Sequence, residues 1–346
     1  MGVSNGANDT SVGTVVIGRN EGDRLVRCLN SVNSESKLIV YVDSGSTDGS
    51  VETARQIGAR VYELDTHSPF TAARARNAGA RVLLTNVENL DFLQFVDGDC
   101  EMSPDWRTAA LDFVKDRDDI GVICGIVEER APELSIYNRL CAMDWAGASG
   151  NVSSCGGIAM VRSKAFCEIG GFNEAMIAGE EPEMCYRMRQ RGWKIHKLNV
   201  PMALHDAGMT RFSQWWKRAM RSGHAYAEGN ARHGNLLLGF RAREVRSILF
   251  WALGIPLAVV VLTIWLGPVL LLLLSLYGVQ WWRIRASRLR VDGDADDATL
   301  FACFCVLGKF AELLGMLRYW LNRVSGKKSA LIEYKGVPPS ATPKES

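Results

Sequence analysis

The sequence predicts an α/β domain built on a doubly wound, mostly parallel sheet, followed by a C-terminal helical hairpin in a membrane. Two observations lead to this prediction. Residues 12–205 alternate between β-branched, strand-like runs and helix-like segments, as parallel sheets with crossover helices do. Residues 247–282 contain no charged side chain, and this stretch exceeds the about 20 residues that one bilayer crossing needs.

The composition is otherwise that of an ordinary globular protein. The 346 residues are 47% apolar and 23% charged, which argues against wholesale disorder and against a fibrous repeat. Lys and Arg number 40 against 38 acidic residues, so a dedicated nucleic-acid binder is not expected. The nine cysteines form no C-x-x-C pair, which favours buried free thiols in a reducing compartment over a disulfide framework or a zinc site.

The alternating region divides into short segments of two kinds. Strands are expected over 12–18, 37–43, 59–64 and 92–97, and helices over 21–32, from 48 or 50 onward, and over 70–84. In such sheets a ligand binds outside the carboxyl ends of the strands. Asp43 and the pair Asp97 and Asp99 close two of these strands, so acidic side chains are expected to gather at that edge.

Asp97-Gly98-Asp99 follows a nearly continuous apolar strand. On a continuing strand, residues two apart face the same side, and Gly98 relaxes the backbone, so both carboxylates are expected to approach one ion. Oxygen ligands at this spacing suit Mg²⁺ or Mn²⁺, with substrate phosphates and water completing the coordination. The alternative is a surface turn, for which Asp-Gly-Asp is also a common composition.

Residues 179–183, Gly-Glu-Glu-Pro-Glu, indicate a helix start. Pro182 is expected at the first helical position, with Glu180 and Glu181 immediately before it. A carboxylate at a helix start stays ionised and can accept a proton. Solvent-facing charges at a helix N-terminus are the alternative.

The segments VVIGRNEGD, VDSGSTDGS, ARARNAG, FVDGDC and GGFNEAMIAGEEPEMCYRMRQRGW follow one another in this order. Together they resemble the family 2 inverting glycosyltransferases over about residues 12–225. The resemblance implies a GT-A fold, a divalent cation, and transfer of a sugar from a nucleotide diphosphate donor.

The resemblance also implies roles for individual residues on the donor side. Asn20 and Glu21 are expected to line the nucleotide pocket after the first strand. Asp43 is similar to the carboxylate that reads the uracil or ribose of the donor, and Arg74 and Asn77 are expected in the donor pocket.

The catalytic and metal-binding positions are carried over in the same way. Asp97, Gly98 and Asp99 are similar to the D-x-D motif, with Asp99 as the direct metal ligand. The second acidic residue of the family's E-D or D-D segment is the general base. Glu181 stands there, with Glu180 as the second candidate, and the longer Glu in place of Asp leaves the reach of the base open.

Several residues are candidates with an equally plain structural alternative. His205 is a candidate third metal ligand or diphosphate contact, or else a structural histidine. Gly156 and Gly157 are expected beside the acceptor, or else form tight turns, and Trp145 is expected to contact the acceptor or to lie on a buried helix face.

Residues 211–229 interleave basic and aromatic side chains, which suits a donor diphosphate, anionic lipid, or both. Arg218 is the expected diphosphate contact. Processive synthases of the family carry a Q-x-x-R-W segment here. Gln214 matches it, but Arg218 stands where the tryptophan is expected, which favours single addition over processive synthesis.

The uncharged stretch is interrupted by Leu266-Gly267-Pro268, which predicts two short crossings that form a hairpin. One tilted span and a re-entrant hairpin are the alternatives. Arginines flank the stretch on both sides, so both ends are expected on the cytoplasmic side of an inner membrane. The apolar segment 299–323 contains Lys309 and Glu312, which are costly at mid-bilayer, and is expected to be an interfacial or docking helix.

The expected organisation is a flexible N-terminus over 1–11, the catalytic domain over 12–240, the hairpin over 247–282, the docking helix over 299–323, and a tail over 324–346. The expected activity is metal-dependent, inverting sugar transfer. The donor is a nucleotide diphosphate sugar, with a UDP-sugar favoured. The acceptor is a lipid-linked or saccharide molecule at the cytoplasmic membrane face, as in exopolysaccharide or cell-envelope biosynthesis.

Three alternatives stay open: a processive polysaccharide synthase, a sugar nucleotidyltransferase, and an inactive membrane scaffold with a nucleotide-binding domain. The GRNEGD loop lacks the Gly-rich phosphate loop of nucleotidyltransferases, and the filled acidic positions argue against an inactive scaffold.

Overall fold

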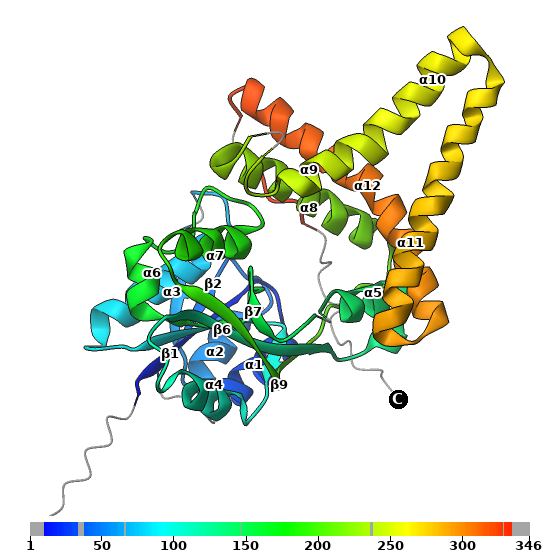
Figure 1. The fold of residues 1–346 in the computed structure, drawn as a ribbon. Coiled ribbons are helices and arrows are strands. Elements are labelled where there is room, and N and C mark those ends of the chain that lie inside the picture. The colour runs from blue at the N-terminus through cyan, green and yellow to red at the C-terminus, as the bar shows by residue number, and fades with distance from the viewer. Residues whose placement is uncertain are drawn as a thin grey trace, which may run out of the picture.

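A nine-stranded mixed sheet is the centre of the N-terminal part of the protein (Figure 1). The computed structural model describes residues 10–33, 38–65, 67–145, 147–235, 238–327 and 329–333. The strands are β1 (Val12–Gly18), β2 (Ile39–Asp43), β3 (Arg60–Glu63), β4 (Phe92–Asp97), β5 (Cys100–Met102), β6 (Ile120–Glu129), β7 (Gly150–Val152), β8 (Ala159–Arg162) and β9 (Lys194–His205). Their order across the sheet is β3-β2-β1-β4-β8-β6-β9-β5, with β7 paired to β9.

The predicted strands form the parallel half of this sheet. β1 pairs in parallel with β2 and β4, and β2 pairs in parallel with β3. β1 and β2 are buried almost throughout, as the apolar runs in their sequences indicated, because helices cover both faces. Ile17 lies opposite Asp97, so the loops after β1 and β4 open at the same edge of the sheet. The doubly wound GT-A architecture that the sequence predicts is confirmed.

The helices of this part are α1 (Asp23–Asn33), α2 (Ser50–Ile57), α3 (Ala72–Asn86), α4 (Trp106–Val114), α5 (Ile136–Trp145), α6 (Ser163–Glu168), α7 (Glu180–Gln190) and α8 (Phe212–His233), with a 3₁₀ turn at Pro132–Leu134. α1 shows how the sequence sets their orientation. Leu25, Cys28, Leu29 and Val32 recur at helical spacing, and all of them are buried against the sheet.

The C-terminal part is helical and projects away from the sheet as a hairpin (Figure 1). It comprises α9 (Ala242–Ile248), a π-helical segment (Leu249–Gly254), α10 (Ile255–Leu266), a 3₁₀ segment (Pro268–Leu274), α11 (Ser275–Asp292) and α12 (Ala295–Val324). The chain reverses at Gly267, whose φ of 91° suits glycine. Near the tip, Trp265 is 80% exposed and Leu272 is 70% exposed. The break predicted at Leu266-Gly267-Pro268 is therefore the apex of a hairpin.

α12 packs along α8 rather than standing apart. A Cβ on Gly223 of α8 would lie 1.9 Å from the carbonyl oxygen of Glu312, and one on Gly315 of α12 would lie 1.8 Å from that of Met220. The two backbones are thus in direct contact. Within the described residues, two helical stretches are long and apolar enough to cross a membrane, Ala242–Trp265 and Ala295–Val324. The second of these is the helix docked on α8.

The chain after α12 returns toward the sheet domain. Ser329 Oγ lies 2.9 Å from Nε2 of the buried His224, and Ile332 is only 4% exposed. Residues 329–333, within the stretch 324–346 that was expected as a tail, pack against the domain. Residues 334–346 of the predicted tail and residues 1–9 of the predicted flexible N-terminus lie outside the described residues.

Candidate active site

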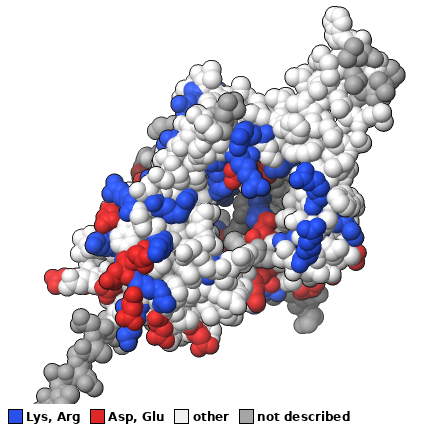
Figure 2. All heavy atoms as spheres, in the orientation of Figure 1, with Lys and Arg blue, Asp and Glu red and all other residues white. Residues whose placement is uncertain are grey.

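A cavity of about 610 Å³ opens at the edge of the sheet where β1 and β4 end. This volume lies within the usual range for small-molecule sites. Its ionisable lining comes from distant segments of the chain, namely Glu21, Asp97, Asp99, Glu180, Glu181, His205 and the arginines Arg19, Arg24, Arg76, Arg218, Arg221 and Arg241. Figure 2 shows Lys and Arg side chains gathered around a hollow near the middle of the molecule. A concave, arginine-rich surface with carboxylates inside suits a phosphate-bearing ligand and a cation.

Asp99 and His205 form the group best suited to a divalent cation. With Cys100 they place one candidate ligand atom each within 4.8 Å of one another. His205 Nε2 lies 3.5 Å from Asp99 Oδ2, and its Nδ1 lies 2.7 Å from Oε2 of the buried Glu129. Because a carboxylate accepts the Nδ1 proton, the lone pair of Nε2 is directed to the Asp99 side. A carboxylate oxygen beside an imidazole nitrogen suits Mn²⁺ and tolerates Mg²⁺.

Asp97 does not join this group, contrary to the expectation that both carboxylates of the D-G-D segment approach one ion. β4 ends at Asp97, so Asp97 and Asp99 do not lie on one continuing strand. Asp97 Oδ1 instead accepts a hydrogen bond of 2.8 Å from Arg76 Nη2. Gly98 between them donates its N–H to the carbonyl oxygen of Ile17 at 2.8 Å, which ties the segment to the end of β1.

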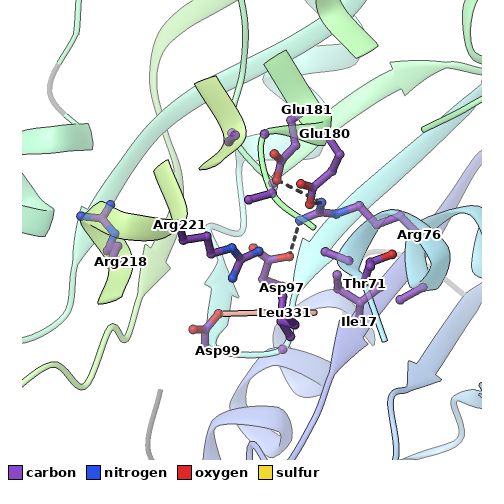
Figure 3. A pocket seen from close by; sticks show the side chains of 18 of the residues that line it. Ile17, Thr71, Arg76, Asp97, Asp99, Glu180, Glu181, Arg218, Arg221 and Leu331 are labelled. Carbon is purple, nitrogen blue, oxygen red and sulfur yellow. Dashed lines mark hydrogen bonds and ion pairs between the residues drawn. The ribbon is translucent and has the colours of Figure 1, made fainter. Parts of the chain in front are cut away.

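Arg76 joins Asp97 to the start of α7 (Figure 3). Its Nη1 donates to Glu180 Oε1 at 2.9 Å and to Glu181 Oε1 at 3.0 Å. The Arg76 side chain is only 2% exposed. Burial lowers the pKa of Arg76, but the attraction of Asp97, Glu181 and Glu180 outweighs this and holds the pKa above its usual value. Arg76 was absent from the sequence-based candidates.

Glu180 and Glu181 differ in exposure although they are neighbours. The Glu181 side chain is 18% exposed and that of Glu180 is 3% exposed. Burial and the adjacent Glu180 raise the pKa of Glu181 to about 7, although Arg76 acts in the opposite direction. α7 begins at Glu180 with Gly179 as N-cap. Pro182 is therefore the third helical residue, whereas the sequence analysis expected it at the first helical position.

Asn20 and Glu21 line the cavity as predicted. Asn20 adopts a left-handed conformation with φ of 54°, and its Oδ1 accepts a hydrogen bond of 2.7 Å from the N–H of Thr47. Glu21 Oε2 lies 2.8 Å from Arg24 Nη2. The bond between Asn20 and Thr47 holds the loop after β1 against the loop after β2, and the Glu21–Arg24 pair joins the loop after β1 to α1.

Asp43, Arg74 and Asn77 are not part of the cavity lining, unlike the other predicted donor-side residues. Asp43 accepts hydrogen bonds from Tyr41 Oη and from the N–H groups of Gly45 and Ser46, all at 2.8 Å. Arg74 donates to backbone oxygens of residues 65, 68 and 69. Asn77 bonds to both backbone groups of residue 172. Each of the three stabilises a loop beside the site.

The predicted acceptor-side residues all line the cavity. Gly156 lies next to Trp145, since its Cβ would be 3.3 Å from the Trp145 ring. A Cβ on Gly157 would be 2.4 Å from Arg76 Nη2. Arg218 donates to Asp144 Oδ2 at 2.7 Å, at the side of the cavity formed by α8.

Two further parts of the lining were not singled out as site residues, although Arg221 belongs to the basic and aromatic segment 211–229 that was expected to suit a donor diphosphate. Arg221 points from α8 toward Asp97 and Asp99 (Figure 3). Its spacing of three from Arg218 on one helix was a usable signal, because residues three apart share a helix face. Leu331 and Glu333 also line the cavity, and Glu333 Oε1 lies 2.7 Å from Arg19 Nη1. No sequence pattern indicated this return of the C-terminal segment.

Comparison with known proteins identifies the domain. Residues 14–167 match the model of glycosyl transferase family 2. A pre-mycofactocin glycosyltransferase of Mycobacterium tuberculosis is 26% identical over 240 residues, which is 66% of this chain and 49% of that protein. The succinoglycan biosynthesis protein ExoA of Rhizobium meliloti is 26% identical over 172 residues, 45% of this chain and 50% of that protein. The chain therefore spans about half the length of these curated relatives.

A solved structure agrees with the fold. The mannosyltransferase PcManGT of Pyrobaculum calidifontis, in complex with GDP-Man and Mn²⁺, superposes with a TM-score of 0.55 over 88% of this chain and 86% of that one, at 17% identity. Sequence motifs in unbroken order, the sheet topology and the family match agree with one another. The chain thus has the GT-A fold, and its residues 14–167 match glycosyl transferase family 2.

Proposed function

We propose that this protein uses a divalent cation to transfer a sugar from a nucleotide diphosphate sugar to an acceptor hydroxyl, with inversion at the anomeric carbon. One observation carries the proposal. A single cavity has Asp99 and His205 at one side and Glu181 at another, with arginines between them. Displacement of a nucleoside diphosphate requires positive charge at the leaving group, which a cation at Asp99 and His205 and the arginines would supply. It also requires a base at the attacking hydroxyl, which Glu181 would supply.

Asp99 and His205 are the residues proposed to hold the cation, with Mn²⁺ or Mg²⁺ as its identity. The bound ion would stabilise the negative charge that develops on the departing diphosphate. Arg218 and Arg221 on α8 are proposed to bind the same diphosphate oxygens, because guanidinium groups bind phosphates in a bidentate way. The solved mannosyltransferase with the same fold contains Mn²⁺, which supports this assignment.

Glu181 is the proposed general base. It has the more exposed carboxylate of the pair and a pKa raised to about 7, so it can take up a proton near neutral pH. Glu181 removes the proton from the acceptor hydroxyl while the hydroxyl oxygen forms a bond to the anomeric carbon. The bond from that carbon to the diphosphate oxygen breaks on the opposite face. One displacement of this kind inverts the configuration.

The donor and the acceptor are proposed by class. Asn20 and Glu21 would contact the nucleotide. A UDP-sugar is favoured as donor, although the solved relative binds GDP-Man. A lipid-linked or saccharide acceptor is proposed on the side of Trp145, Gly156 and Gly157, with one sugar added in exopolysaccharide or cell-envelope assembly. The relative named as a succinoglycan biosynthesis protein supports that setting.

The proposed organisation places the catalytic domain over 12–240, a membrane hairpin over 247–282 and a docking helix over 299–323. The exposed apolar tip of the hairpin supports membrane insertion, since monomeric soluble proteins seldom expose such a surface. Arginines at the base of both hairpin helices support a cytoplasmic position of the domain at an inner membrane.

The test is a donor screen with the full chain in lipid nanodiscs. Release of nucleoside diphosphate is measured for UDP-, GDP- and dTDP-sugars, with a membrane lipid extract as acceptor and with Mn²⁺, Mg²⁺ or a chelator. We expect release with one class of donor, dependent on the cation and on the acceptor. Equal release in the chelator would refute the metal assignment. The Asp99→Asn variant should behave as the wild type does in chelator.

A further inference from the structure

Arg76 lies between the two sides of the proposed site. One guanidinium nitrogen, Nη2, contacts Asp97, which follows β4 on the donor side. The other, Nη1, contacts Glu181 and Glu180 at the start of α7. In sequence, Asp97 is 21 residues from Arg76 and Glu181 is 105 residues from it. The single guanidinium group of Arg76 therefore connects, through hydrogen bonds, two segments that lie far apart in the sequence.

The surroundings of Arg76 leave it little freedom. Its guanidinium carbon lies 5.5 Å from the centre of the Phe172 ring, and its side chain is 2% exposed. Arg76 itself is on α3, whose helix also carries Asn77, the side chain that fixes residue 172. A buried side chain with ionic partners at both nitrogens and a ring over its face has one available position.

Gly157 provides the space for this position. A Cβ there would lie 2.4 Å from Arg76 Nη2 and 2.6 Å from Asp97 Oδ2. No real Cβ approaches polar atoms so closely, so any other residue at 157 displaces the Arg76–Asp97 pair. The sequence offered Gly157 only as an acceptor contact or a tight turn.

We propose that Arg76 is a positioning residue that sets the separation between the base Glu181 and the donor-side carboxylate Asp97, and that Gly157 is required because it lets the guanidinium reach both. This inference rests on the proposed function. Two reacting groups must be held within about 1 Å of the productive geometry, and a misplacement of that size costs about 100-fold in rate. Lysine cannot replace Arg76, because one ammonium group lacks the two separate nitrogens that reach the two sides.

The main test is Gly157→Ala, which shifts the guanidinium without removing a charge. We expect kcat to fall about 100-fold, while the dissociation constant for nucleoside diphosphate with Mn²⁺, measured by calorimetry, changes far less. Gly147→Ala is the matched control. Gly147 lies outside the cavity lining and its Cβ would meet Lys197 Nζ at an ordinary 3.5 Å, so wild-type kinetics are expected.

A double-mutant cycle separates the Arg76 role from a direct clash with the acceptor. Arg76→Lys should lower kcat by a similar factor, and the double variant with Gly157→Ala should lose no more than Arg76→Lys alone, because both changes disrupt one contact. A folded Gly157→Ala variant with wild-type kcat would overturn the inference. So would a double variant whose loss is the product of the single losses. Absence of cation-dependent transfer in the wild type would instead overturn the proposed function.

Discussion

At the scale of residues, Glu180 and Glu181 show how exposure divides two identical side chains. Both accept a hydrogen bond from the same nitrogen of Arg76, at 2.9 and 3.0 Å. Only Glu181 has a carboxylate with appreciable access to the cavity, 18% against 3%. The proposed contact with an acceptor hydroxyl is therefore assigned to Glu181, while Glu180 balances the buried charge of Arg76.

Glu181→Gln should abolish turnover and keep donor binding. Loss of a general base costs about 10² to 10⁴ in rate, whereas Asp99 and His205, the proposed cation ligands, are unchanged. Turnover and nucleotide affinity are to be measured separately. Glu180→Gln is the companion variant, and we expect it to retain more turnover than Glu181→Gln. The reverse order would move the base to Glu180.

The Glu181→Gln variant should gain stability relative to the wild type as the pH rises from 5 to 8. Burial raises the pKa of Glu181 from its usual value of 4.5 to about 7, so the folded state favours the protonated acid. Stability from this group is complete below about pH 4.5 and is lost as the pH rises through 7. Gln carries no charge. Relative to the wild type, Glu181→Gln is expected to gain melting temperature between pH 5 and pH 8, to be checked by thermal scans in the absence of metal; a constant difference across that interval would contradict the raised pKa.

At the scale of elements, the packing of α12 on α8 depends on two glycines. Gly223 and Gly315 each face a backbone carbonyl of the other helix, at Cβ distances below 2 Å. Either helix must move outward if a methyl group is added there. The apolar cluster around Ala227, Ile248 and Met316, which joins α8, α9 and α12, would then open.

Gly315→Ala should therefore destabilise the protein, by about 1–3 kcal/mol as for other overpacked interfaces. Thermal unfolding in detergent is the measurement. Gly308→Ala is the control on the same helix, since its Cβ would meet Trp215 at an ordinary 3.7 Å. The control should not lose stability, because Ala favours helix over Gly. Equal melting temperatures for the two variants would show that the two helices do not pack in this way.

The elements also show which parts of the fold the sequence could predict. β1, β2 and β4 were predictable because parallel strands covered on both faces form unbroken apolar runs. The site was partly predictable, since Asp99 and Glu181 follow a strand end and mark a helix start. The place of Arg76 in the site could not be predicted, because its ionic partners Asp97 and Glu181 are distant in the sequence and no local pattern marks a buried arginine. Asp43 and Asn77 were expected in the donor pocket, but their side chains bond to loops beside the cavity, which sequence patterns do not show.

At the scale of the whole molecule, the hairpin is the proposed contact of the sheet domain with a membrane. The helix preceding the apex and the segment following it expose apolar side chains, among them Ile264, Trp265 and Leu272. Arginines lie at the other end of the hairpin, near the domain. This distribution is that of a segment whose tip enters hydrocarbon while its base meets lipid headgroups.

Replacing Ile264, Trp265 and Leu272 together by Ser should abolish flotation of the protein with liposomes. These three side chains are 76%, 80% and 70% exposed, so their replacement leaves the packed core intact. Cation-dependent transfer to a water-soluble acceptor should persist. Leu238→Ser is the control, because Leu238 is also 67% exposed but lies outside the hairpin. Continued flotation of the triple variant would show that the tip is not the anchor.

Removal of all residues after 246 would change more than the contact with a membrane. Such a truncation deletes α12 and exposes the face of α8 on which it packs, including Gly223. It also deletes Leu331 and Glu333, which line the cavity. We therefore expect the truncated protein to be less stable than a variant altered only at the hairpin tip.

The ion pair between Arg19 and Glu333 joins the first strand to the last described residues of the chain. During synthesis on the ribosome, Arg19 emerges early and Glu333 emerges after the whole hairpin and α12. One wall of the cavity is consequently made last, after every other segment that lines it has been synthesised. A ribosome that stops before residue 331 thus leaves the cavity incomplete.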